Sequence, residues 1–312
     1  MPVQPPRLFK YLSLPRLSQI LGDLNIRFTQ PGHLNNPHEL SVMLNAETIQ
    51  VDFYNHMVAG GSPPAEAADI ARRNAPALVI DLAKTVERQR ADLGVLSLSA
   101  DEDNMLLWAH YGDEHRGAII ELDAEQILIS DPSPQAVQAL LQVQYESSRV
   151  DFIARDLPLW MTVSFKSEPW AYEREWRLVR SLELLREKAP SIHVAEIPAA
   201  AIKRVVFGAR ADARAEEPIY NAAKTRPDLK HVVFEKAWFS SSLTKVERTP
   251  VEQFGWTILH GEHHFGDDWR LIRQWADLDA MQRSESADVA AAAQKAAREA
   301  ESHAAKIRNP KA

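Results

Sequence analysis

The stretch SEPWAYEREWRLV, residues 167–179, constrains the fold more than any other part of the chain. Its charged and aromatic residues lead into an apolar run, which is typical of the start of a β-strand. Because side chains alternate along a strand, we expect Glu173, Glu175 and Arg177 on one face and the intervening residues on the other. Two interpretations remain open: an ion-pair ladder on a solvated sheet edge, or a charged face that meets a substrate or partner.

The composition is that of a globular protein. The 312 residues are 45% hydrophobic and 25% charged, enough to bury a large core. The formal net charge of -7 argues against non-specific electrostatic binding of nucleic acid, although a local basic groove remains compatible with it. The chain has no cysteine, which excludes disulfides and a thiol nucleophile and fits a reducing compartment. Since the proline-rich N-terminus is unlike a signal peptide and no apolar run approaches ~20 residues, we expect a cytoplasmic protein without membrane contact.

Helix and strand patterns are mixed along the chain without regular alternation. This favours an α+β fold, with a mixed central sheet and surrounding helices, over a doubly wound sheet. Strand patterns occur at 7–14, 93–99, 117–122, 143–146, 192–197, 202–207, 231–239 and 242–247. Helix patterns occur within 40–91, with breaks at 60–64 and at Pro76, from Met105, and over 131–140, 150–163 and 215–225.

The domain organisation follows from a change of composition near the C-terminus. Residues 1–250 are expected to form a single α+β catalytic-like domain, and residues 251–281 an extension packing on it. Residues 282–312 have strong helix propensity but almost no large apolar side chains. They are expected to be a solvated helix or a disordered tail, and this C-terminal helix is a candidate contact for a partner.

Two segments ahead of residues 167–179 carry further candidate site residues. Ser97 and Ser99 alternate onto one face of a predicted strand, where their hydroxyls either satisfy backbone groups or take part in a site. In MLLWAHYGDEHRG, the residues Trp108, His110 and Tyr111 either line a pocket, with rings for stacking and polar atoms for hydrogen bonding, or belong to the core.

The three histidines in LHGEHHFGDD suggest a metal site at first sight. Gly261 and Gly266 make a helix there improbable, and no acidic ligand stands at a fixed spacing from His260, His263 and His264. We therefore predict a surface loop and no metal. The sequence also contains no glycine-rich phosphate loop, nucleophile elbow or zincin signature.

Several of these pieces occur together in a fixed order: FKY, LNNPHE, SLS, MLLWAHYGDEHRGAIIEL, PWAYEREWRLV and IKRVVFGAR. The ordered set resembles the bacterial family of unknown function DUF2971, and the resemblance covers roughly residues 8–247. The most specific part is W-x-H-Y-x-x-x-H-x-G followed by E-x-E-W-R. The chain departs from the resemblance at Asn36 and His38, where Asp and Phe are expected.

A weaker similarity concerns the order of a basic first strand, a Ser-x-Ser strand and a late Glu-x-Glu. This order is similar to the arginine, serine, glutamate layout of ADP-ribosyltransferases. The resemblance implies NAD as the substrate, with Glu175 holding the nicotinamide ribose and stabilising its developing positive charge, and Glu173 orienting or deprotonating the acceptor. The other implied roles are phosphate contacts from Arg7 or Lys10, positioning by Ser97 or Ser99, and stacking on nicotinamide by Tyr11, Trp108 or Tyr111.

The predicted function is therefore an ADP-ribosyltransferase-like enzyme, a bacterial stress or phage-defence effector, with a protein or nucleic-acid acceptor. One alternative is an RNA-directed toxin in which His110 and Glu175 are acid and base, next to a basic groove of Arg174, Arg177 and Arg180 with Lys203 and Arg204. Another is a non-catalytic module that senses a nucleotide. Arg177 is the main objection to the first hypothesis, since it can pair with either glutamate.

Overall fold

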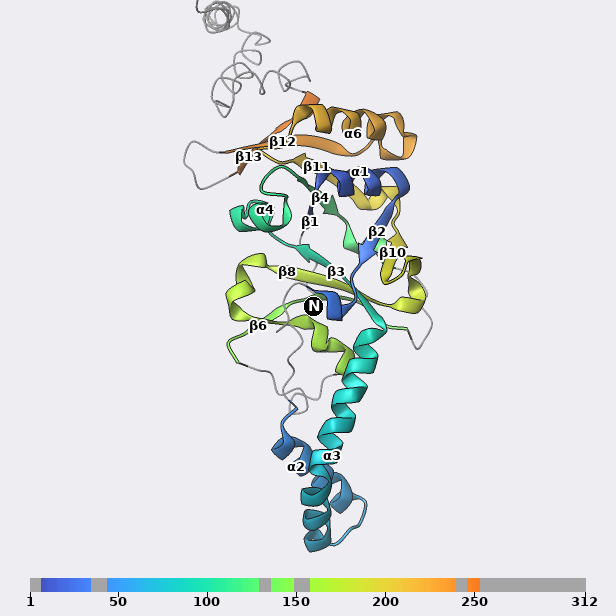
Figure 1. Cartoon of the computed structure of the whole chain (residues 1–312), viewed down its shortest axis with the longest axis vertical. Helices are drawn as coiled ribbons and strands as arrows, with labels where there is room; N and C mark the ends of the chain where they lie inside the picture. Colours follow the sequence, from blue (N-terminus) through green and yellow to red (C-terminus); the bar gives the residue numbers. More distant parts are fainter. Residues whose placement is uncertain (1–6, 35–43, 129–135, 149–157, 240–245, 253–312) are drawn as a thin grey trace, which may run out of the picture. The chain divides into compact units, whose positions relative to one another are not determined.

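The computed structural model describes residues 7–34, 44–128, 136–148, 158–239 and 246–252 (Figure 1). The chain divides into two compact units. The first comprises Met1–Lys10, Asp23–Asn104 and Glu121–Ile202, and the second Tyr11–Gly22, Met105–Ile120 and Lys203–Ala312. Helices occur together with strands that pair in both directions, so the predicted α+β class is confirmed. The predicted extension and tail lie, apart from residues 251 and 252, outside the described residues.

The first unit is built on four strands. They follow in the order β1 (Leu8–Leu12), β3 (Leu93–Ser99), β8 (Glu175–Ser181) and β5 (Gln138–Gln142). β3 and β8 pair antiparallel from Leu93↔Ser181 to Ser99↔Glu175, and β5 pairs antiparallel with the other side of β8. β8 is thus an interior strand, and of the two interpretations left open for its charges, the one that places them on a sheet edge was wrong.

β5 corrects a second prediction. Residues 131–140 were expected to be helical, but those from Gln138 onward form this strand. Val137 and Leu141 pack against a core of Leu93, Val95, Val163 and Val179. Hydrogen bonding to β8 and this packing outweigh the weak local preference for helix, because β-strand formation depends on tertiary context.

The helix predicted over 150–163 is described only at its end. There, residues Leu159–Ser164 form the 3₁₀ helix η2 rather than an α-helix. Residues 149–157 lie outside the described part. Val163 of η2 is fully buried and belongs to one core cluster with Leu93 and Val95 of β3 and Val179 of β8.

Smaller elements complete the first unit. A second antiparallel sheet has the order β2 (Asn25–Phe28), β10 (Ile192–Glu196) and β9 (Arg186–Ala189). β6 (Gln144–Glu146) and β7 (Phe165–Ser167) form a parallel pair. The short helices are α5 (Ala124–Ile127), η1 (Pro31–His33), η3 (Glu168–Glu173), η4 (Leu182–Leu184) and η5 (Ala199–Ala201).

The helical region predicted within 40–91 is a hairpin of α2 (Ala46–Ala59) and α3 (Pro64–Ala91). The break at 60–64 is confirmed, whereas the expected break at Pro76 was wrong because α3 continues through it. Proline removes one helical hydrogen bond and clashes with the preceding turn. Ala67, Ala71 and Ala75 are buried along the helix, and α3 packs on α2, so packing holds the helix together across the proline.

The second unit is built on four strands in the order β13 (Val246–Pro250), β12 (Val233–Phe239), β11 (Ile202–Phe207) and β4 (Ala118–Leu122). β11 and β12 are parallel and are joined through α6 (Ala213–Thr225), while β12 and β13 are antiparallel. The unit also contains α1 (Leu14–Asp23), α4 (Met105–Tyr111) and η6 (Pro227–Leu229). The rings of Phe207 and Phe234 stack at a centroid distance of 6.0 Å in its core. Across the described parts of both units, no helix is long and apolar enough to span a bilayer.

Candidate functional site

A group of buried charges lies in the first unit, and we call Lys166, Glu173, Glu175 and Arg177 the glutamate cluster. Their residues are between 1% and 7% exposed. Glu175 and Arg177 share one face of β8, as predicted from strand alternation. That face is buried, however, so the interpretation of a solvated ion-pair ladder was wrong. Charges this deeply buried need partners, and the cluster supplies them internally.

The contacts of the cluster are short and directional. Arg177 donates from Nε to Glu175 Oε1 at 2.8 Å and from Nη2 to Glu175 Oε2 at 3.0 Å, a bidentate pair. Its Nη1 donates to the Val163 carbonyl at 2.6 Å. Lys166 Nζ donates to Glu173 Oε2 at 2.6 Å and to Glu175 Oε2 at 3.1 Å. One ammonium therefore bridges the two carboxylates.

A tight turn brings Glu173 beside Glu175. The helix η3 ends at Glu173, and Arg174 adopts the left-handed conformation with φ 46° and ψ 47° before β8 begins. Ser99 anchors this turn: its hydroxyl donates to the Glu173 carbonyl at 2.7 Å and accepts from the Asp101 amide at 2.9 Å. A left-handed residue other than glycine is uncommon and mildly strained, so these contacts are what hold it in place.

The electrostatics of the site keep Glu175 ionised. Burial by itself would raise the pKa of the Glu175 carboxyl, but Arg177, Lys166 and a hydrogen bond from the Ser97 side chain together lower it to about 2. The Glu175 amide donates to the hydroxyl oxygen of Tyr145 at 2.7 Å. Burial, with Glu175 and Glu173 nearby, raises the pKa of Tyr145 to about 12, so its phenol stays neutral.

This depressed pKa predicts a loss of stability in acid. The contribution of the Glu175 charge is fully present above its ordinary pKa of 4.5 and is lost as pH falls toward about 2. Between pH 6 and pH 3 we expect the wild type to lose about 2 kcal/mol of unfolding free energy through this group. Denaturant unfolding of wild type and Glu175→Gln at each pH measures this loss. The difference in unfolding free energy between the two proteins should become smaller as the pH falls. A difference that stays constant over this range would contradict the prediction.

Five of the predicted site residues come together around the cluster. Lys10 on β1 donates from Nζ to the Ser97 carbonyl at 2.9 Å, and Ser97 and Ser99 lie on β3 beside Glu173 and Glu175. Burial lowers the pKa of the Lys10 ammonium, and the charges of Glu175 and Glu173 act against this change. Three neighbouring elements thus direct side chains to one place.

Arg7 lies apart from these contacts. Its guanidinium donates to Glu121 at 2.8 and 2.6 Å and contacts Glu102 at 3.5 Å, and its side chain is 57% exposed. A role in binding phosphates would require it to leave a bidentate carboxylate partner. Lys10 is therefore the better placed of the two basic residues.

The remaining predicted residues belong to the second unit. Trp108 is 1% exposed and packs edge-to-face on Tyr11 at a centroid distance of 5.4 Å, which is the core role left open for it. Its ring also stacks on that of His115 at 6.1 Å. His110 is exposed and contacts the Tyr111 ring at 6.3 Å.

Sequence reasoning missed Lys166 and Tyr145. Lys166 lies in the strand β7 within MTVSFKSEPW, where a lysine after an apolar run was the available signal. No pattern in the sequence marks Tyr145, because its contact with the Glu175 backbone joins residues 30 positions apart. The rings of Trp170 and Tyr172 also lie close to the cluster, and Lys166 Nζ is 4.9 Å from the Trp170 ring centroid.

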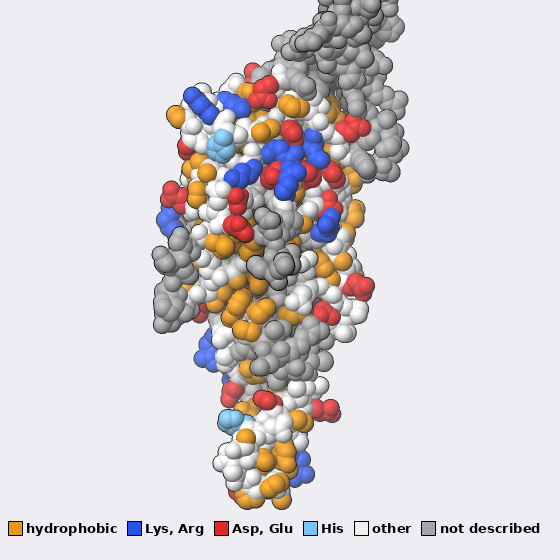
Figure 2. All heavy atoms as spheres, turned by 180° about the vertical axis from the view of Figure 1, so that it is seen from behind, with side chains coloured by type: hydrophobic (Ala, Val, Ile, Leu, Met, Phe, Trp, Pro, Cys, Tyr) orange, Lys and Arg blue, Asp and Glu red, His pale blue; other side chains and the backbone are white. Residues whose placement is uncertain are grey.

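The basic groove proposed for RNA binding is corrected in part. Arg177 and Arg180 are 1% and 2% exposed, and Arg180 donates to the Ile127 carbonyl and to Gln138. Neither can offer its charge to a phosphate backbone at the surface. On the face shown in Figure 2, the coloured basic side chains lie interspersed with acidic ones.

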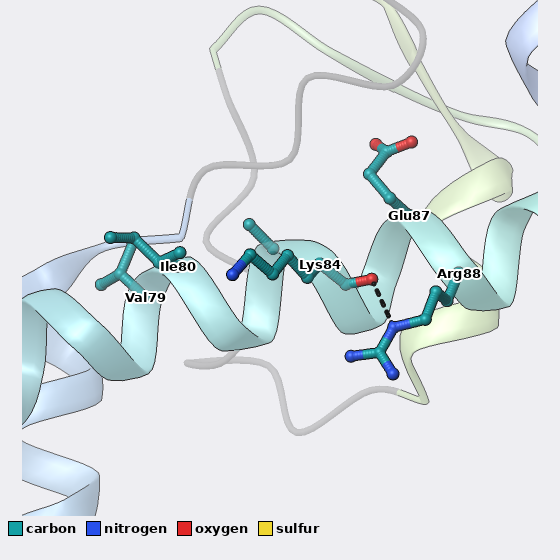
Figure 3. A pocket seen from close by; sticks show the side chains of 6 residues that line it. Val79, Ile80, Lys84, Glu87 and Arg88 are labelled. Carbon is teal, nitrogen blue, oxygen red and sulfur yellow. Dashed lines mark hydrogen bonds between the residues drawn. The ribbon is translucent and has the colours of Figure 1, made fainter.

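A hollow of about 570 Å³ lies elsewhere, along α3 (Figure 3). It is lined by Val79, Ile80, Ala83, Lys84, Glu87 and Arg88. Arg88 Nε donates to the Lys84 carbonyl of the same helix at 3.3 Å, and Ile80 is 55% exposed. All six lining residues come from the single helix α3, and the charged ones, Lys84, Glu87 and Arg88, are joined by no lining group from a second element.

The comparisons with known proteins bear on this part of the chain. Residues 107–178 match DUF2971, a protein of unknown function. The DUF2971 match covers less than a quarter of the chain, but it includes the whole glutamate cluster. No curated protein and no solved structure matches the chain. The resemblance to the ADP-ribosyltransferase layout therefore stays a prediction.

Among the described residues, no group of three or more His, Asp and Glu side chains is arranged to hold a metal ion. The histidines at 260, 263 and 264 lie outside the described part.

Proposed function

We propose that the chain is an ADP-ribosyltransferase-like enzyme that uses NAD as its substrate and the glutamate cluster as its catalytic centre. The observation that carries the proposal is the strand order β1-β3-β8. It places Lys10, the Ser97 and Ser99 strand, and Glu175 side by side. In the proposal they take the parts of the basic, serine and glutamate elements of the transferase layout, and their convergence from distant parts of the sequence supports it.

The chemistry suits a fixed, ionised carboxylate. In the proposed reaction, the bond between ribose C1′ and the nicotinamide nitrogen breaks, and its electron pair leaves with neutral nicotinamide. C1′ then bonds to the acceptor, whose proton passes to Glu173. Positive charge develops on the ribose between these events, and Glu175 stabilises it because its charge is set in place beforehand.

Cationic side chains surround the two carboxylates of the cluster. Lys10, Lys166 and Arg177 each act on Glu173 or Glu175. In the proposal, Lys10, the cation that β1 contributes, contacts the pyrophosphate of NAD. Arg177 does not remove Glu175 from the reaction in this proposal. It orients the carboxylate and keeps it charged.

The test is NAD cleavage by the purified protein with labelled NAD and cell lysate. Glu175→Gln keeps the size of the side chain and is expected to lower kcat by about 10²–10³-fold, the effect of removing one preorganised electrostatic group. The matched control is Glu125→Gln, an exposed glutamate on α5 for which we expect wild-type turnover. Circular dichroism and thermal unfolding establish that each variant is folded.

Other outcomes would favour the competing functions. A wild type that binds NAD without ever consuming it would indicate a sensing module. A wild type that neither binds nor consumes NAD would end the proposal. If the protein cleaves RNA and His110→Ala abolishes that cleavage, the RNA-directed toxin takes its place.

A further inference from the structure

Lys166 contacts both carboxylates of the glutamate cluster. The ammonium lies 2.6 Å from Glu173 Oε2 and 3.1 Å from Glu175 Oε2. Its side chain is 5% exposed, as is that of Glu175, and that of Glu173 is 6% exposed. A buried lysine that bridges two buried acids is an expensive arrangement, because all three charges must be taken out of water.

Without a cation between them, two neighbouring buried carboxylates cannot both remain ionised. Like charges at short range in a medium of low polarity force one carboxyl to keep its proton, so that the pair shares a proton. The proposed reaction needs both carboxylates ionised: Glu175 to stabilise positive charge on the ribose, and Glu173 to accept a proton from the acceptor. Arg177 is bidentate with Glu175, whereas Lys166 contacts both.

We infer that Lys166 is the positioning residue of this site, which holds Glu173 and Glu175 at a fixed separation and lets both carry their charge. This inference rests on the proposed function and identifies the residue that positions its two carboxylates. Lys166 touches neither the ribose nor the acceptor in this scheme. It acts through the two glutamates.

The groups that face the ammonium come from several elements. The Trp170 ring of η3 lies 4.9 Å from Lys166 Nζ, and Tyr172 of the same helix interacts electrostatically with it. Tyr145 of β6 and Arg177 of β8 are the other titratable or charged neighbours, with Lys10 of β1 acting on the same glutamates. Both tyrosine pKa values are raised from their ordinary value, so neither phenol ionises near neutral pH.

The absence of cysteine from the chain allows a chemical rescue. Lys166→Met removes the ammonium and keeps most of the side-chain volume. Lys166→Cys also removes it, and aminoethylation of the unfolded protein followed by refolding restores an ammonium at position 166 alone. Lys188→Cys, treated in the same way, is the matched control, because Lys188 pairs with Asp23 at the surface.

The first readout does not depend on NAD. In ¹³C NMR titrations of the glutamate carboxyl carbons, assigned with Glu173→Gln and Glu175→Gln, we expect one cluster carboxylate to titrate at least about one pH unit higher in Lys166→Met than in wild type. Aminoethylated Lys166→Cys should titrate as wild type does. Cluster carboxylates that titrate in Lys166→Met as in wild type would overturn the inference.

The second readout is the pH profile of NAD cleavage. We expect kcat at pH 7 to fall at least about tenfold in Lys166→Met, with KM little changed, and the acid limb of the profile to move upward with the NMR titration. Aminoethylation of Lys166→Cys should return both kcat and the acid limb of the profile to their wild-type values. A shifted titration with an unmoved acid limb would refute the positioning role, whereas a wild type with no NAD cleavage at all would refute the proposed function and leave the NMR result to stand.

Discussion

Replacing Arg177 with methionine is expected to lower the free energy of unfolding by about 3–5 kcal/mol, the usual cost of removing one partner from a buried ion pair. The guanidinium is 1% exposed and makes a bidentate contact with Glu175 and a third hydrogen bond with the Val163 carbonyl. Its removal leaves the Glu175 charge with Lys166 and the Val163 carbonyl without this donor. Both effects favour the unfolded state, in which water solvates these groups.

Denaturant unfolding at pH 7 measures this loss. Arg174→Met is the matched control, since Arg174 is exposed and lies three positions earlier, and we expect its effect to stay within about 0.5 kcal/mol. The double variant Arg177→Met with Glu175→Gln should recover part of the loss, because it no longer buries an undercompensated charge. If Arg177→Met is no more damaging than Arg174→Met, then the pair is not buried in solution.

Lys236→Met is expected to have an effect of similar size in the second unit, about 3–5 kcal/mol of unfolding free energy. Lys236 Nζ donates to Glu216 Oε1 at 2.7 Å and to the Ala211 carbonyl at 2.8 Å. Both side chains of this pair are 0% exposed. The variant removes the Lys236 ammonium from the buried Glu216 carboxylate, which must then either keep its charge at a higher cost or take up a proton.

Two further variants separate charge from packing at this position. Lys236→Met with Glu216→Leu replaces the whole pair by apolar side chains and should be much closer to wild type than either single variant. Lys230→Met, an exposed lysine next to η6, is expected to be nearly neutral. A double variant as unstable as Lys236→Met would show that lost packing, rather than a stranded charge, causes the effect.

The local sequence pattern predicted several helices and strands correctly. Residues 93–99 are apolar and form β3, and MLLW opens α4, as expected. The pattern failed at Pro76 and in the residues from Gln138, where contacts with α2 and β8 decide the conformation. Helix and strand preferences amount to fractions of a kcal/mol per residue, whereas such contacts contribute more in total.

The sequence also predicted some features of the candidate site and not others. Alternation along a strand correctly placed Glu175 and Arg177 on one face, and Ser97 beside Ser99 on another strand. It could not show whether the charged face meets water or is buried, since that depends on β8 being an interior strand rather than an edge. The sequence could not show whether Arg7 or Lys10 is the better candidate for contacting phosphates. That depends on the partners that the fold brings to each of them.

What the sequence determined by itself was therefore local: the α+β class, most strands, and the one stretch in which charges enter a strand. The tertiary structure alone decided that Lys166 bridges Glu173 and Glu175 and that Arg177 holds Glu175 in a bidentate pair. The physical reason is that alternation follows from backbone geometry within a few residues. Burial and the choice of ionic partner arise from strands and turns brought together from distant parts of the chain, and these set both the charge of Glu175 and its proposed role.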